Sequence, residues 1–250
     1  MLDDVQLERY SRQIILPQVD LIGQERLLAS RVLVVGAGGI GCPVVLYLAR
    51  SGVGAIEIVD SDSIELSNLP RQIAYQFSDV GSRKAQVLAR EAKASNPDIQ
   101  VEAHESSLKD FLRHQNLSRF SLVIDATDSV AAARDLNRAA VSTQTPLLYV
   151  SATGTEGRIF VSEGWRSGQP CIECLLGPSE REEQGCQTMG VLSPSVGAIA
   201  VLAAVQALKA LLDRAAAGVF CLDTWTFDTM RVALNKDPAC AACGGDKGDR

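Results

Sequence analysis

A glycine-rich segment, Gly36-Ala37-Gly38-Gly39-Ile40-Gly41, constrains the fold of this chain more than any other feature of its sequence. It follows a continuous apolar, β-branched run at 31–35 and precedes a segment of helical composition at 43–51. Such a run is typical of a strand buried on both faces of a parallel sheet. The pattern G-x-G-x-x-G between a strand and a helix lets the backbone turn tightly and approach a phosphate at the helix N-terminus. The sequence therefore predicts a nucleotide site at Gly36, Gly38, Gly39 and Gly41, although this motif alone leaves NAD, FAD and ATP open.

Strand-like and helix-like segments continue to alternate after this unit. We expect strands at 55–59, 99–103, 120–124 and 147–150, and helices at 24–28, 84–95 and 131–142. This alternation is typical of an α/β fold with a Rossmann-like, doubly wound and mostly parallel sheet. After Gly154 we expect antiparallel strands that extend the sheet, with a strand at 158–162, a loop at 169–193, a buried helix at 196–212 and a hairpin at 219–231.

We expect a single domain over 1–250, with an N-terminal helical arm (1–30), a nucleotide-binding part (31–150) and a third part (151–250). The net charge of −6 gives no support for nucleic-acid binding, since such domains usually carry a basic patch. The sequence has no run of about eighteen apolar residues, so it predicts no membrane span. The first four residues lack the features of a secretion signal, so we expect a cytoplasmic protein.

Charged and amide side chains follow the second strand. Asp60 lies at its end, where a carboxylate can accept hydrogen bonds from ribose hydroxyls. Arg71 and Lys84 could neutralise a triphosphate, and Asn68 could donate an amide hydrogen bond to it. Attack on an α-phosphate needs such a group because negative charge builds on the phosphate oxygens, whereas hydride transfer does not. The alternative is that Arg71 and Lys84 are ordinary solvated charges.

Asp128 follows the fourth predicted strand, and ligands bind at the carboxyl ends of parallel strands. A carboxylate at this position could hold Mg²⁺ against the phosphates. The alternative interpretation is that Asp128 caps the helix that follows.

Seven cysteines are present, and four of them form two C-x-x-C pairs, Cys171/Cys174 and Cys240/Cys243. Two such pairs can close a tetrahedral structural Zn²⁺ site, and a redox-active pair is the alternative. Cys186 lies in the predicted loop and could act as a nucleophile or carry a persulfide. His104 and His114 lie in a polar stretch, and we expect both at the surface.

Together these motifs resemble the ThiF/MoeB/HesA family of adenylating enzymes, bacterial relatives of ubiquitin-activating enzymes. The matching segments run almost from end to end: Arg9 to Ile14, the glycine-rich segment, Asp60, Ser67 to Gln72, Lys84, Thr127-Asp128, both cysteine pairs and the segment around Cys186. Two positions depart from the family pattern, since Ser129 stands where Asn is frequent and Pro70 where Gln is frequent.

The resemblance implies ATP-dependent adenylation of the C-terminal Gly-Gly carboxylate of a small ubiquitin-like, β-grasp sulfur-carrier protein. It implies that Asp60 binds the ribose, that Asn68, Arg71 and Lys84 contact the phosphates, and that Asp128 assists Mg²⁺; we count Asp62 and Gln72 among the nucleotide contacts as well. Arg12 would reach the active site of the other protomer of a homodimer. Residues 151–250 would bind the carrier, with a crossover loop around Cys186.

The resemblance also bears on the pathway. The segment around Cys186 is closer to the thiamin-type enzyme, in which this cysteine would link covalently to the carrier's tail, than to the molybdopterin type. The sequence ends soon after Cys243, so we expect sulfur from a separate donor, a cysteine desulfurase or a rhodanese-type protein.

Two other functions compete with this one. An NAD(P)-dependent oxidoreductase would explain the glycine-rich segment and Asp60 but would leave Arg71, Lys84 and the cysteine pairs without a role. A non-catalytic binder of a ubiquitin-like protein would require the loss of a nucleotide contact, and every expected contact is present.

Overall fold

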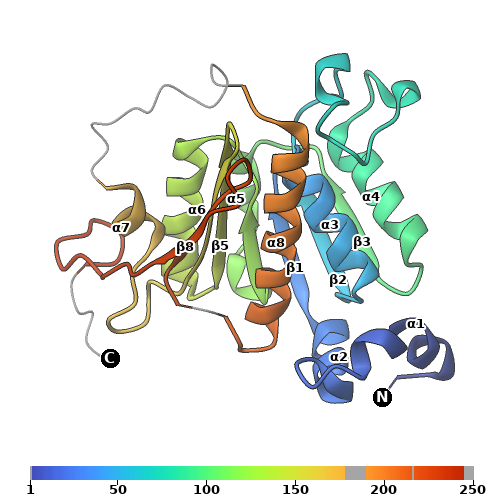
Figure 1. Cartoon of the computed structure of the whole chain (residues 1–250), viewed down its shortest axis with the longest axis horizontal. Coiled ribbons are helices and arrows are strands. Elements are labelled where there is room, and N and C mark those ends of the chain that lie inside the picture. Colours follow the sequence, from blue (N-terminus) through green and yellow to red (C-terminus); the bar gives the residue numbers. More distant parts are fainter. Residues whose placement is uncertain (1, 178–189, 216, 245–250) are drawn as a thin grey trace.

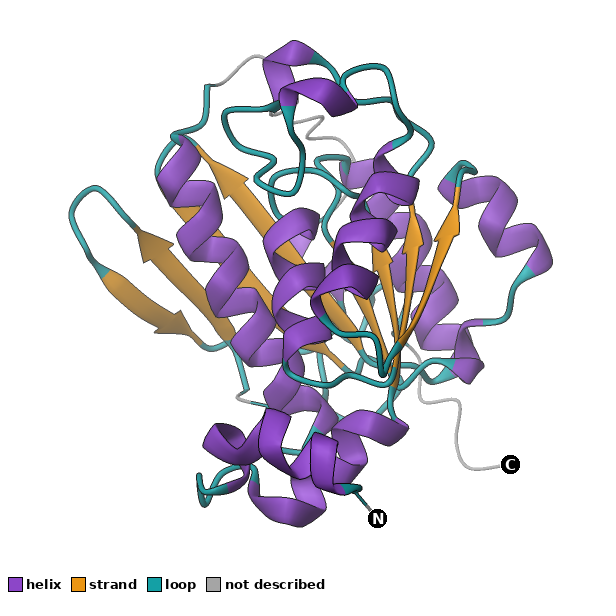
Figure 2. Ribbon diagram, turned by 90° about the vertical axis from the view of Figure 1, so that its right-hand side faces the viewer, coloured by secondary structure: helices purple, strands orange, loops and turns teal. Residues whose placement is uncertain are grey.

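One eight-stranded sheet runs through the computed structural model, which describes residues 2–177, 190–215 and 217–244 (Figures 1 and 2). Its strand order is β3-β2-β1-β4-β5-β6-β7-β8. The parallel strands are β1 (Arg31–Val35), β2 (Ala55–Val59), β3 (Gln100–His104), β4 (Leu122–Asp125) and β5 (Leu147–Thr153). The antiparallel strands are β6 (Glu156–Ser162), β7 (Val219–Asp223) and β8 (Thr229–Val232). The predicted α/β fold with an antiparallel extension is confirmed.

Helices cover both faces of this sheet (Figure 1). On one face lie α3 (Gly41–Arg50), α4 (Lys84–Ser95) and α8 (Ser193–Leu211). On the other lie α5 (Leu108–His114), α6 (Val130–Thr143) and the short α7 (Ile172–Leu176). Successive residues of β1 enter the two cores in turn, Val32 and Val34 on one face and Leu33 and Val35 on the other. This is why the strand reads as an uninterrupted apolar run.

Helix α8 is the described helix whose length and apolar composition would suffice to cross a membrane. It packs against α3, β5 and β6. Val196, Ile199, Ala200 and Ala203 on this helix are buried in the core. The buried helix that the sequence predicts at 196–212 is confirmed, and burial in the core explains its composition.

The two ends of the parallel strands form two different edges of the sheet. At the amino edge, α1 (Asp4–Ile14) and α2 (Asp20–Ala29) make the N-terminal arm, at the bottom of Figure 2. At the carboxyl edge, the order of connections reverses between β1 and β4, which is where open α/β sheets bind ligands. Short 3₁₀ segments at Leu66–Asn68 and Phe77–Asp79 lie between β2 and α4, and another at Leu117–Arg119 precedes β4.

The segment between β3 and β4 differs from the sequence-based expectation. Helix α5 was not predicted, and the expectation that His104 is a surface residue without a partner is wrong. His104 Nε2 lies 2.8 Å from Oε2 of Glu57, a carboxylate buried on β2 that also pairs with Arg31 and Arg119. A charge inside the sheet needs such partners because burial removes its hydration.

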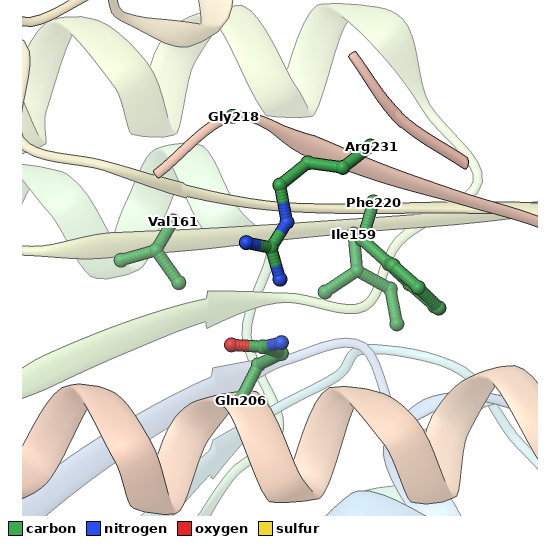
Figure 3. Close-up of a pocket in the computed structure, with 6 residues that line it drawn as sticks. All are labelled: Ile159, Val161, Gln206, Gly218, Phe220 and Arg231. Carbon is green, nitrogen blue, oxygen red and sulfur yellow. The ribbon is translucent and has the colours of Figure 1, made fainter. Parts of the chain in front are cut away.

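A small pocket lies between α8 and the antiparallel strands (Figure 3). The guanidinium of Arg231 on β8 points toward Gln206 on α8, whose Oε1 has no hydrogen-bond partner among the described residues. The pocket has a volume of about 10 Å³, which suits one water molecule and excludes a nucleotide.

Candidate active site and metal centre

Two glycines of the glycine-rich segment are required by the backbone itself. Gly36 has a φ of +96°, and a Cβ there would lie 2.7 Å from the carbonyl oxygen of Ala126. A Cβ on Gly41 would lie 1.9 Å from the carbonyl oxygen of Gly36. These glycines let the loop between β1 and α3 fold against the end of β4.

Gly38 is different, because nothing in the described chain fills the space beside it. A Cβ on Gly38 would come no closer than 3.9 Å to another group, the Nε2 of Gln72. The N–H groups of Gly38, Gly39 and Ile40 have no acceptor among the described residues. Unpaired N–H groups at the start of a helix attract an anion, so the loop is open where a phosphate would sit.

Asp60 lies against this loop, as the sequence predicts. Its Oδ2 accepts a hydrogen bond from the N–H of Ala37 at 2.7 Å, and its Oδ1 accepts one from the N–H of Asp62 at 2.8 Å. Burial raises the pKa of Asp60, while the two N–H donors and the charge of Lys84 oppose this shift. The carboxylate therefore joins the glycine-rich segment to the end of β2.

Lys84 is buried at the first position of α4, so it is not an ordinary solvated charge. Its side chain is 10% exposed, and its Nζ donates to Oδ2 of Asp62 at 2.9 Å. Asp62 is itself largely exposed. The ammonium group is thus held beside the loop by one partner that faces the solvent.

The segment from Ser67 to Gln72 packs against the glycine-rich segment. A Cβ on Gly39 would lie 3.3 Å from the carbonyl oxygen of Arg71 and 3.4 Å from its Cγ. Asn68 is buried and accepts a hydrogen bond from the N–H of Glu65. Gln72 is buried as well, and its Oε1 has no hydrogen-bond partner in the part of the chain that the structure describes. An unpaired buried amide oxygen next to the loop is costly unless a ligand or water satisfies it.

The end of β4 corrects one interpretation of Asp128. Ser129 caps α6 by accepting a hydrogen bond from the N–H of Ala132, so the interpretation of Asp128 as the helix cap is wrong. Asp128 is exposed, three residues after the carboxyl end of β4. Its carboxylate is therefore available at the edge where the sequence places it.

Asp125, three residues earlier, is a site residue that sequence reasoning missed. Its Oδ1 accepts hydrogen bonds from the N–H and the hydroxyl of Thr127, and its Oδ2 is buried without a partner among residues 2–177, 190–215 and 217–244. Burial raises its pKa to about 7. An acidic residue at the last position of an apolar strand was the available signal.

One further predicted residue, Arg12, lies outside this cluster. Arg12 is on α1, whose neighbours Arg9 and Tyr10 contact Asp98 and Asn96 at the amino edge, so the chain does not bring its own Arg12 to the glycine-rich segment. Cys186 lies outside the described residues.

The four predicted metal ligands converge, although the two pairs are 69 residues apart. The Sγ atoms of Cys171 and Cys240 are 3.6 Å apart, and those of Cys174 and Cys243 are 3.5 Å apart. Four thiolates around Zn²⁺ at about 2.3 Å would be separated by roughly 3.8 Å. Both distances join sulfurs of different pairs, and both are shorter than the 4.0 Å between Cys171 and Cys174 within one pair. This arrangement favours a shared metal over a redox pair.

Neighbouring groups orient these ligands. Asn137 on α6 donates to Sγ of Cys171 at 3.4 Å and accepts a hydrogen bond from the N–H of Ile172 at 2.9 Å. The N–H of Asp237 donates to Sγ of Cys174 at 3.4 Å. N–H donors to the sulfurs stabilise thiolates, so the donor set fits a structural Zn²⁺.

Fold and site together define a nucleotide-binding α/β domain with its loop at the switch point of the sheet. Solved structures share the fold of this chain. Escherichia coli MccB with ATP has a TM-score of 0.79 and 22% identity, over 95% of this chain and 75% of that chain. A second MccB crystal structure, "MccB + MccA-N7isoASN", has a TM-score of 0.81 and 22% identity, over 94% of this chain and 75% of that chain.

The model of the ThiF family matches residues 10–242, and the chain belongs to this family. The sulfur carrier protein ThiS adenylyltransferase of Escherichia coli is 37% identical over 99% of both chains. The molybdopterin-synthase adenylyltransferase of Salmonella typhimurium is 36% identical over 97% of this chain and 98% of the relative. The SAMP-activating enzyme E1 of Haloferax volcanii is 36% identical, over 97% and 91% of the two chains.

Proposed function

We propose that this protein is an adenylyltransferase that transfers AMP from ATP to the C-terminal Gly-Gly carboxylate of a small ubiquitin-like sulfur-carrier protein. The observation that carries the proposal is the set of unpaired N–H groups of Gly38, Gly39 and Ile40 beside two cations, Arg71 and Lys84. The names of the relatives support the same reaction.

The proposed reaction is an in-line displacement at the α-phosphorus. A carboxylate oxygen of the carrier bonds to the α-phosphorus, and the bond from this phosphorus to the bridging oxygen breaks. The bridging oxygen leaves with the bonding electrons as part of pyrophosphate, and an acyl-adenylate remains. Arg71, Lys84 and Asn68 lower the barrier because they stabilise the charge that builds on the phosphate oxygens. Asp60 holds the ribose, with Asp62 and Gln72 beside it.

We propose Mg²⁺ as the catalytic cation. The exposed carboxylate of Asp128 fits it, because carboxylate oxygen is the ligand that Mg²⁺ prefers. The ion would neutralise phosphate charge. Zn²⁺ would be held by Cys171, Cys174, Cys240 and Cys243, with four thiolates and no open position for catalysis. It would fasten the segment around Cys240 to α7.

The remaining assignments complete the proposal. Residues 31–150 would bind the nucleotide and residues 151–250 the carrier, with Cys186 on the crossover loop. A homodimer would bring Arg12 of one protomer to the site of the other, and the exposed apolar Ile15 and Ile22 of the N-terminal arm offer a contact surface. A cytoplasmic cysteine desulfurase or rhodanese-type protein would supply sulfur for the thiocarboxylate. A thiamin-type carrier is favoured, and molybdopterin-type or other carriers are the alternatives.

The test is ATP–pyrophosphate exchange by zinc-loaded protein with Mg²⁺ and a panel of carriers that end in Gly-Gly. We expect exchange with one carrier, no exchange when its Gly-Gly is deleted, and loss of exchange in Arg71→Ala. Arg138→Ala, which removes an exposed arginine on α6, is the matched control and should exchange normally.

Three results would contradict the proposal. Absence of exchange with every carrier would exclude adenylation of this class. Tight NADH binding without exchange would favour an oxidoreductase. Carrier binding without exchange would favour a non-catalytic binder.

A further inference from the structure

Tyr75 is buried, and its hydroxyl contacts the glycine-rich segment. This residue belongs to none of the sequence motifs and has no role in the proposed reaction. Its hydroxyl donates to the carbonyl oxygen of Ala37 at 2.7 Å and lies 3.3 Å from the carbonyl oxygen of Lys84. The hydroxyl therefore connects the loop after β1 to the first turn of α4. Burial raises the pKa of Tyr75, so the hydroxyl keeps its proton and remains a donor.

The Ala37 residue is fixed at both of its backbone groups. Its N–H donates to Asp60, and its carbonyl accepts from Tyr75 and, at 3.4 Å, from the thiol of Cys42. Burial raises the pKa of that thiol to about 12, so Cys42 is a neutral, weak donor. The stronger donor to this carbonyl is the Tyr75 hydroxyl.

The carbonyl of Ala37 and the N–H of Gly38 belong to one planar peptide group. A donor that fixes the direction of the carbonyl therefore also fixes the direction in which the Gly38 N–H points. That N–H is one of the unpaired donors of the loop. Because Tyr75 also contacts the backbone of Lys84, the same hydroxyl limits the distance between this donor and the cation.

We propose that Tyr75 is a positioning residue for ATP, whose hydroxyl orients the Gly38 N–H toward the phosphates and sets its spacing from Lys84. This inference rests on the proposed function in one respect, the identity of the nucleotide. Tyr75 itself does not touch the reacting atoms in this proposal. It pre-organises the donors that do, which saves the cost of ordering them when the nucleotide binds.

The test is Tyr75→Phe, which removes the hydroxyl and keeps the ring. We expect the Kd for ATP, measured by calorimetry with Mg²⁺, and the KM for ATP in exchange to rise roughly tenfold, the effect of losing one buried hydrogen bond. The KM for the carrier should stay within about twofold of the wild-type value. Cys42→Ala removes the weaker donor and should raise the same Kd by a smaller factor, so it extends the test if Tyr75→Phe folds poorly.

Tyr10→Phe is the matched control. It removes a hydroxyl that is equally buried but is paired with Asn96 at the amino edge, at 2.8 Å. We expect it to lower Tm and leave the Kd for ATP unchanged. An unchanged Kd in Tyr75→Phe, or an equal rise in both variants, would overturn the inference. If wild-type protein binds ATP but no carrier supports exchange, the proposed function fails while the Kd comparison still tests Tyr75.

Discussion

The amino and carboxyl edges of the parallel sheet differ in whether their buried polar side chains have hydrogen-bond partners among the described residues. At the amino edge, Asn96 is fully buried and its Nδ2 donates to the Tyr10 hydroxyl and to the Ala49 carbonyl. Gln24 is also fully buried and donates to the Ser51 carbonyl. At the carboxyl edge, Oε1 of Gln72 and Oδ2 of Asp125 are buried without partners, among only three such side-chain atoms in the described residues.

The buried polar groups of the two edges therefore contribute differently to the stability of the fold. A buried hydrogen bond that is made stabilises the fold, whereas a buried group that is left unpaired lowers stability until a ligand or water satisfies it. The amino edge therefore stabilises the fold, and we propose that the unpaired groups of the carboxyl edge are satisfied by a ligand. Four predictions test this division, from the largest expected effect to the smallest.

The largest effect should come from Gly41→Ala, because its Cβ would overlap the Gly36 carbonyl at 1.9 Å. We expect a loss of at least about 4 kcal/mol in the free energy of unfolding, or no soluble protein. Gly38→Ala is the matched variant, since its Cβ meets only a group at 3.9 Å. It should fold with unchanged Tm but bind ATP at least about tenfold more weakly. Equal Tm losses in the two variants would remove the distinction between packing and ligand glycines.

The second effect should be on catalysis alone. Lys84→Ala is expected to lower the exchange rate at least about 100-fold, because a cation at the developing phosphate charge is lost. Its partner Asp62 is exposed, so Tm should change little. Lys93, nine residues further along α4, donates to the Pro97 and Ile99 carbonyls near the amino edge. Lys93→Ala should exchange at the wild-type rate, and a comparable loss there would contradict the division between edges.

The third prediction is for a loss of stability without a loss of nucleotide binding. Asn96→Ala leaves the Ala49 carbonyl and the Tyr10 hydroxyl without their donor, so we expect a loss of about 2–3 kcal/mol in urea unfolding. The KM for ATP of the folded fraction should be unchanged. A rise in that KM would show that the amino edge is coupled to the nucleotide site.

The smallest effect concerns Asp125 and pH. Burial raises its pKa from 3.8 to about 7, so the folded chain holds this proton more tightly than the unfolded chain. The corresponding stability is fully present below about pH 4 and is lost as the pH rises through about 7. Between pH 6 and pH 8 the wild type should lose about 1 kcal/mol relative to Asp125→Asn, whose side chain stays neutral. Parallel stability curves for the two proteins would contradict this prediction.

The sequence was most informative where one local segment decides the conformation. Strand β1 and helix α4 begin and end where the apolar pattern, the glycines and the Asn96-Pro97 stop predict them. The convergence of the cysteine pairs was also predicted, because two C-x-x-C pairs have few other uses in a chain of this kind. The roles of Arg12, Asp128 and Cys186 stay predictions. Arg12 lies at the amino edge of its own chain, the exposed carboxylate of Asp128 has no described contact that assigns its role, and Cys186 lies outside the described residues.

Sequence reasoning failed where a residue's role depends on distant partners. Tyr75 follows the segment from Ser67 to Gln72, which we predicted to contact the phosphates, but its acceptor Ala37 lies 38 residues away in the sequence. His104 reaches Glu57 across 47 residues. Contacts over such sequence separations leave no pattern in the neighbouring residues, so neither contact could be predicted from the sequence.

By itself the sequence determined the succession of strands and helices, the position of the glycine-rich turn between β1 and α3, and the donor set of the cysteine cluster. These follow from backbone sterics and apolar periodicity, which act over a few residues. Only the tertiary structure decided which buried polar groups are paired and which are left unpaired among the described residues. That outcome depends on hydrogen-bond distances between segments far apart in the chain, and packing alone sets those distances.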